Sequence, residues 1–190
     1  MKALIVRKWL PGLLVPILLL AQFAGAADPS KTDGLDRLNG KWKLDWEQSE
    51  SFAPAMQALE VPWLVRQMAG LISVQITFAV APGDCDTCDP SLLIESENPI
   101  QNTSRTVVLD GVPRPFIDVL GNDSMDRFRW HPEGGMEMVR ERILDSGKAA
   151  KIHERRTVDE DLVTMVSTMT VWVDGRERTS VRRILMKVDP

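Results

Sequence analysis

Residues 40–70 read GKWKLDWEQSESFAPAMQALEVPWLVRQMAG, and the opening of this stretch predicts a half-buried β-strand. Apolar and polar residues alternate from Gly40 onward, as they do in a strand with one face against a core. The alternation places Trp42, Leu44 and Trp46 on the same face. Three large apolar side chains on one face predict that this strand packs directly on the core.

The second half of the same stretch predicts two short helices. After Ser51, which can serve as an N-cap, Phe52, Met56 and Leu59 recur at helical spacing. A second helix is expected over residues 62–70, because proline is favoured in the first turn and glycine after the last. It carries three further apolar residues: Trp63, Leu64 and Met68. The apolar side of the helix pair could line an entrance for a ligand or plug the end of the fold, since both uses bury the same face.

From residue 71 onward the chain predicts strands and turns only. The expected strands cover residues 72–79, 92–95, 104–109, 115–120, 125–130, 136–144, 150–157, 162–173 and 179–187. Asp174-Gly175 is a strong hairpin signal between the last two strands. With the first strand this makes about ten, which indicates an all-β fold. A closed antiparallel up-and-down barrel is expected, because closure removes unpaired strand edges.

Composition and charge restrict the class of protein. Of 190 residues, 44% are hydrophobic and 26% are charged, which is typical of a globular domain rather than a disordered chain. The net charge of −4 argues against nucleic acid as a partner. Two cysteines are too few for a disulfide scaffold, so a packed core must hold the fold.

Residues 1–26 have the three parts of a secretory signal peptide: a basic start, a short apolar run and small residues before a cut. An uncleaved membrane anchor is the alternative, but the apolar run is shorter than the roughly 20 residues needed to cross a bilayer. We expect cleavage and a periplasmic or secreted protein without a stable membrane anchor. Residues 27–38 are polar and are expected to form a loose segment before one domain at 39–190.

Three segments of the chain resemble the intracellular fatty-acid-binding proteins. Residues 40–44 and 49–66 are similar to that family's opening G-x-W strand and its S-E-x-F-x-x-x-M-x-A-L-x-V helix segment, and residues 181–188 are similar to its closing T-R-x-Y-x-K strand. The resemblance implies a ten-stranded calycin-type barrel with a two-helix lid after the first strand. Residues 110–115 also look like lipocalin-like exported domains of bacteria, which share the barrel.

The resemblance implies a carboxylate site inside the barrel. The family binds a fatty-acid carboxylate through two interior arginines and a tyrosine, and Arg183 falls on the first of these arginines. Arg155 falls on the second, and Leu185 replaces the tyrosine, which removes one hydrogen-bond donor. Either arginine could instead face outward or pair internally with Glu154 or Glu141. A shift of one residue would exchange them for one of four others: Arg140, Arg142, Arg156 and Arg182.

Apolar residues of one strand and of the first helix complete the expected ligand site. In residues 162–173, Met165, Met169 and Val171 share the more apolar parity and should face inward. Methionines suit a cavity of irregular shape, because the thioether chain repacks easily. A simply filled core has the same pattern. From the first helix, Phe52 and Met56 are added to the site.

The two cysteines and two histidines give weaker signals. Cys85 and Cys88 lie in one loop, and a local disulfide is expected in an oxidising compartment. A redox pair would need a βαβ setting, and a zinc site would need both His131 and His153 as further ligands. Neither metal nor cofactor is therefore expected.

Together these patterns predict an exported barrel that binds a small hydrophobic ligand such as a fatty acid. The alternative is a barrel with a filled core that acts through its surface as an envelope structural or interaction module. An enzyme on the same barrel ranks third, because the sequence contains no nucleophile elbow and no phosphate-binding loop. The sequence leaves the oligomeric state open.

Overall fold

A computed structural model describes residues 34–69, 73–81, 88–97, 102–118, 121–131 and 135–188. The signal peptide predicted at residues 1–26 lies outside these ranges. No helix in the described part has both the length and the apolar character needed to span a bilayer. The elements in chain order are η2 (Leu35–Leu38), β1 (Gly40–Asp45), α1 (Ala53–Ala58), α2 (Trp63–Ala69), β2 (Gln75–Ala81), β3 (Ser91–Glu97), β4 (Thr103–Val108), β5 (Arg114–Ile117), β6 (Asp123–His131), β7 (Gly135–Ile143), β8 (Ala149–Val158), β9 (Thr164–Val173) and β10 (Arg176–Val188).

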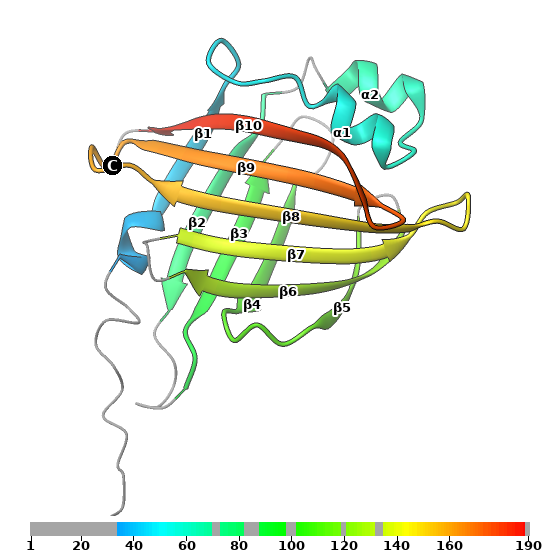
Figure 1. Cartoon of the computed structure of the whole chain (residues 1–190). Coiled ribbons are helices and arrows are strands. Elements are labelled where there is room, and N and C mark those ends of the chain that lie inside the picture. Colours follow the sequence, from blue (N-terminus) through cyan, green and yellow to red (C-terminus); the bar gives the residue numbers. More distant parts are fainter. Residues whose placement is uncertain are drawn as a thin grey trace, which may run out of the picture.

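The ten strands form one antiparallel sheet that curves around a common interior (Figure 1). Strands adjacent in the sequence pair with each other, except for β4 and β5. In addition β1 pairs with β10, which joins the first strand to the last. The tight turn at Asp174 and Gly175 joins β9 to β10, and both residues have positive φ angles, as the predicted hairpin turn requires. The all-β meander and its helix pair confirm the expected fold class.

The sheet is not closed, contrary to the expectation of a closed barrel. Its order runs β4-β3-β2-β1-β10-β9-β8-β7-β6-β5, so β4 and β5 are edges. We call the space between these two strands the seam. The segment after β4 reaches β6 at one isolated bridge between Asp110 and Arg129, where Gly111 donates a hydrogen bond to the carbonyl of Phe128 (2.7 Å). Among the described residues no backbone ladder joins β4 to β5.

The core lies inside the curved sheet, where side chains of alternate residues meet. The largest fully buried side chains come from five strands and from η2. Among them Trp42 of β1 donates its indole N–H to the carbonyl of Leu38 at 2.8 Å. Leu35 and Leu38 are themselves buried. The end of the segment expected to be loose is therefore a 3-10 helix that packs on the core.

The helices α1 and α2 lie together at one end of the sheet (Figure 1). The N-cap of α1 is Phe52 rather than Ser51, whose hydroxyl accepts a hydrogen bond from Ala53 N (3.3 Å). Helix α1 covers the interior with Met56, which is 7% exposed. Helix α2 does not: its residues Trp63 and Leu64 are 64% and 63% exposed, and Met68 is also exposed. The apolar side of α1 is therefore buried, as the sequence predicted for both helices, and the apolar side of α2 is exposed.

Candidate ligand-binding site

Three polar side chains lie in a row across the inner face of neighbouring strands. Arg156 on β8 is directly opposite Ser167 on β9, and Ser167 is directly opposite Arg183 on β10. Glu154 precedes Arg156 by two residues and so shares its face of β8. The antiparallel register thus places two arginines, one serine and one glutamate in a single cluster inside the sheet.

Glu154 is the acceptor at the centre of this cluster. Its Oε1 accepts hydrogen bonds from the Ser167 hydroxyl (2.6 Å) and from Nε of Arg156 (2.8 Å). Burial raises the pKa of this carboxyl, but the charge and hydrogen bond of Arg156 and the hydroxyl of Ser167 outweigh it and hold the pKa below its ordinary value. Glu154 is therefore an ionised carboxylate that engages Arg156.

Arg183 has no such partner. Among the described residues it forms no ion pair, and its buried Nε has no hydrogen-bond acceptor. The guanidinium carbon lies 5.2 Å from the ring centre of Phe52 and 5.7 Å from that of Trp46, close enough for cation–π attraction. Burial lowers the pKa of Arg183 more than the nearby Glu154 charge raises it. The site therefore presents a partly buried cation whose buried Nε donor is unused.

A small cavity adjoins the arginine cluster. It has a volume of about 30 Å³ and is lined by Leu44, Val74, Ile76, Glu154, Arg156, Ser167, Arg183 and Leu185. A space of this size holds about one water molecule. Leu185, at the position of the family's tyrosine, is one of its apolar walls. A ligand larger than a few atoms can enter only if neighbouring side chains move.

The prediction that Arg155 lines the interior is wrong. Side chains alternate between the two faces of a strand, and the buried residues Ile152 and Glu154 of β8 fix the inner face. Arg155 is therefore on the outer face, where its Nη2 lies 3.5 Å from Nδ1 of His131. The neighbouring Arg156 takes the interior position, and its guanidinium carbon lies 5.3 Å from the ring centre of Phe78.

The apolar residues predicted for the site do face inward. Met165 and Val171 are fully buried in the core, and Met169 packs against it while partly buried. Met169 pairs with Val181, and Met165 pairs with Leu185, so the two methionines flank Ser167 and Arg183. Phe52 lies against Arg183, whereas Met56 is a buried residue of α1 itself.

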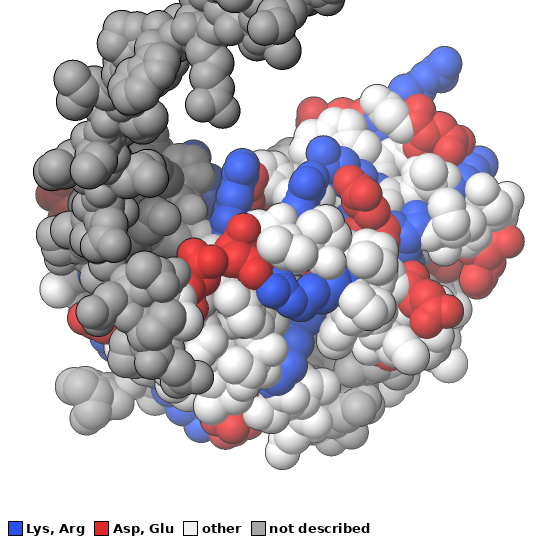
Figure 2. All heavy atoms as spheres, turned by 90° about the horizontal axis from the view of Figure 1, so that it is seen from below, with Lys and Arg blue, Asp and Glu red and all other residues white. Residues whose placement is uncertain are grey.

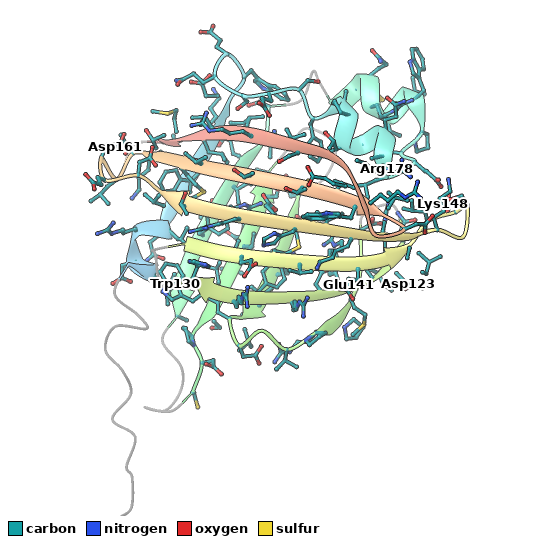
Figure 3. All side chains as sticks on the ribbon, in the orientation of Figure 1. Asp123, Trp130, Glu141, Lys148, Asp161 and Arg178 are labelled. Carbon is teal, nitrogen blue, oxygen red and sulfur yellow. The ribbon has the colours of Figure 1, made fainter. Side chains whose placement is uncertain are left out.

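A second charged cluster, which the sequence reasoning missed, lies at the seam. Asp126 of β6 is 4% exposed and accepts hydrogen bonds from Arg140 of β7 (2.8 and 2.7 Å) and from Arg105 of β4 (3.0 Å). Arg105 lies between two rings, 4.3 Å from the ring centre of Phe116 and 4.8 Å from that of Phe128. Side chains thus connect β4 to β6 inside the sheet. Figure 3 labels Asp123 and Trp130 near the two ends of β6, the strand that carries Asp126. Parity could have located Asp126, because it shares the inner face of its strand with the buried Phe128.

The cysteine and metal predictions remain partly outside the described residues. Cys88 is disulfide-bonded, while Cys85, its expected partner, is not among the described residues. The described residues contain no cluster of three or more ligating side chains that could hold a metal ion. The two histidines face outward rather than into the site.

Solved structures with a similar fold include two fatty acid binding proteins. The fatty acid binding protein of Schistosoma mansoni, solved with arachidonic acid, matches 82% of this chain and 99% of its own, with a TM-score of 0.60 and 21% identity. The chain has the fold of the fatty acid binding proteins. As-p18, an extracellular fatty acid binding protein, matches 80% of this chain and 97% of its own, with a TM-score of 0.53 and 18% identity.

Other comparisons are more distant in sequence or shorter in extent. Secretory abundant heat soluble protein 4 from Ramazzottius varieornatus matches 81% of this chain and 96% of its own, with a TM-score of 0.59 and 11% identity. A probable pericyclase of Mollisia scopiformis is 40% identical over 48 residues, which is 25% of each chain. The chain therefore matches about a quarter of that relative's length. No protein-family model matches the chain.

Proposed function

We propose that this protein binds a small hydrophobic carboxylate, such as a fatty acid, inside the barrel. The carboxylate accepts hydrogen bonds from Arg183, and the apolar part packs among inward-facing side chains of β9 and the lid. Fatty acid binding proteins are among the neighbours in fold, and one of them was solved with arachidonic acid. The identity of the ligand, the role of Arg183 as its anchor and the export of the protein are all parts of the proposal.

The observation that carries this proposal is the unpaired Arg183. A buried charge without a partner costs several kcal/mol, and proteins compensate for it with counter-charges or hydrogen bonds. Glu154 is occupied by Arg156 and Ser167, so it offers Arg183 only a longer-range attraction. A ligand carboxylate would supply both the charge and the acceptors that Arg183 lacks.

The apolar part of the ligand requires side chains to move. The cavity beside Arg183 has room for little more than a head group. Met169 and Phe52 are partly buried and lie next to the cluster, so they can shift at lower cost than the fully buried core. Methionine side chains adapt to irregular shapes. We place the apolar tail between Met169 and the lid residue Phe52.

We further propose that the protein acts outside the cytoplasm. Residues 1–26 have the order of a signal peptide, and two neighbours in fold are described as secretory or extracellular. A cleaved leader would start the mature chain close to η2, whose leucines are buried in the core. Mass spectrometry of the protein from the culture medium or periplasm would give the mature N-terminus.

Native mass spectrometry before and after solvent extraction tests the binding function. We expect one small acidic lipid per chain before extraction and its loss afterward. A chain that is repeatedly free of ligand and does not take up oleic acid would instead support the filled-core barrel, which acts through its surface. The small cavity and the continuous buried core favour that alternative.

A second candidate function is a pericyclic reaction inside the barrel. The 48-residue similarity to a probable pericyclase favours it. Such a reaction rearranges bonds in one concerted step, so orientation in a closed apolar space can accelerate it without a nucleophile or a general base. A product with the same elemental composition as its substrate would indicate catalysis, whereas recovery of the unchanged ligand supports binding alone.

A further inference from the structure

A basic hollow lies on the outer face of the sheet, on the opposite side of the strands from the lipid site. We call it the outer basin. Its volume is about 220 Å³, and it is lined by Gly111, Arg127, Arg129, Glu137, Val139, Lys151 and His153. The lining carries three arginine or lysine side chains against one carboxylate, in a chain whose net charge is negative. Figure 2, which views the molecule from below relative to Figure 1, shows basic and acidic side chains interspersed on the side that it displays.

Glu137 is unusually buried for a residue on the outer face of a sheet. It is 6% exposed and contacts Arg129 and His153 on the neighbouring strands. One carboxylate oxygen accepts from Nε of Arg129, and the other is bonded to Nε2 of His153. Burial raises the pKa of Glu137, but these two contacts outweigh it and hold the pKa below its ordinary value. Glu137 is therefore a charged anchor that fixes two rim side chains.

The remaining cations of the basin are weakly paired. Arg127 is 3.9 Å from the exposed Glu141, a long ion pair that is open to solvent. Lys151 forms no ion pair among the described residues, and its ammonium lies 5.9 Å from the ring centre of Trp172. Arg129 donates to Glu137 through Nε, so its two terminal nitrogens do not take part in that hydrogen bond. Donors from β6 and β8 therefore flank the hollow.

An apolar surface forms the floor between these cations. Val139 is 8% exposed although it faces outward, and it lies directly opposite His153 and Arg127. The volume of about 220 Å³ exceeds that of a single oxyanion. A ligand that fits would carry a charged oxyanion group and a small uncharged remainder that rests on Val139 and Gly111.

We propose that the outer basin binds a phosphate or sulfate monoester. The three cations outnumber the carboxylates of Glu137 and of Glu141, which pairs with Arg127, so the basin keeps a positive charge that attracts an oxyanion. Guanidinium groups hydrogen-bond the oxygens of such groups in fixed geometry, and an ammonium adds a point charge. This site is separate from the interior lipid site and does not depend on it.

Two-dimensional NMR of the ¹⁵N-labelled full chain tests this proposal. Inorganic phosphate and glycerol phosphate are titrated separately against sodium chloride of equal ionic strength. We expect saturable shifts of the Arg129 Nε–H and the His153 ring with both phosphates, and tighter binding of the ester. Tighter binding of the free ion would mean that the apolar floor plays no part and would overturn the ester assignment.

Two charge-removing variants complete the test. Lys151→Gln should weaken phosphate binding by about fivefold or more, because it removes one charge-assisted contact. Lys43→Gln removes the same charge from an exposed position on β1 and should leave the affinity within about twofold. Circular dichroism checks that both variants fold. Equal affinities in the two variants, or shifts that chloride reproduces, would overturn the proposal.

Discussion

At the residue scale, one step along a strand decides whether an arginine is interior or exterior. Arg182 and Arg183 are neighbours on β10, yet Arg182 is exposed and Arg183 is partly buried beside Phe52. The inner face of a strand is fixed by its buried partners, here Val181 and Leu185. This pair provides a natural comparison, because the same substitution at each position removes the same charge from opposite faces.

Arg183→Gln should weaken binding of a fluorescent fatty acid by about tenfold or more, since a hydrogen bond to a charged group contributes about 1.5–3 kcal/mol. Arg182→Gln should leave the affinity unchanged, because Arg182 faces solvent. Fluorescence titration followed by displacement with oleic acid gives both dissociation constants. The anchor assignment fails if the two folded variants bind equally well.

Arg183→Met should raise the free energy of unfolding of the ligand-free protein by about 1 kcal/mol, because it replaces a buried unpaired charge with an apolar chain of similar length. Urea denaturation of the delipidated protein measures this change. A residue with a purely structural role would give the opposite sign. A loss of stability in this variant would therefore argue against Arg183 as a site kept for a ligand.

The sequence correctly placed Arg183 inside the sheet, but it assigned the second interior position to Arg155 instead of Arg156. Arg183 was placed by its match to the closing-strand arginine of the fatty-acid-binding proteins, and in the structure it shares a face with the buried Val181 and Leu185. Arg155 was placed by counting back across the acidic turn at residues 159–161, where alternation gives no guidance. An error of one residue moves every side chain of a strand to the other face.

At the scale of the elements, the seam explains what alternation could and could not predict. All ten strands were expected within a few residues of their observed bounds, because alternation and turn residues mark them. The prediction of a closed barrel was wrong, because local periodicity does not show which strands pair with each other. β5 is only four residues long and contains Pro115, which cannot donate a backbone hydrogen bond.

Asp126→Asn should lower the free energy of unfolding by about 3 kcal/mol, because it leaves Arg105 and Arg140 inside the sheet without a counter-charge. Asp123→Asn, at an exposed position of the same strand, should change it by less than about 0.5 kcal/mol. Both values come from urea denaturation at pH 7. Similar small changes in the two variants would mean that the seam cluster does not hold the sheet together.

At the scale of the whole molecule, ionised carboxylates inside the sheet make stability depend on pH. Burial raises the pKa values of Asp126 and Glu154, but neighbouring guanidinium groups outweigh it and hold both below their ordinary values of 3.8 and 4.5. A pKa that is lower in the folded state stabilises the protein above the unfolded pKa. This contribution is lost as the pH falls toward the folded pKa.

We therefore expect the free energy of unfolding to stay nearly level from pH 7 to about pH 5 and to fall below about pH 4. Urea denaturation at intervals of one pH unit measures this curve. The Asp126→Asn variant should show a shallower fall, because one of the two carboxyls no longer titrates. A loss of stability that is complete before pH 5 would contradict the assignment to these carboxyls.

The central claim is that Arg183 holds a ligand carboxylate inside the barrel. Oleic acid labelled with ¹³C at its carboxyl carbon tests it directly, because the chemical shift of that carbon reports ionisation in the bound state. A carboxylate beside a buried guanidinium has a lowered pKa. We predict one bound signal that stays ionised at pH 4 in the native protein and titrates near its ordinary pKa in Arg183→Gln. A bound signal that titrates alike in both proteins, or no bound signal at all, would contradict the claim.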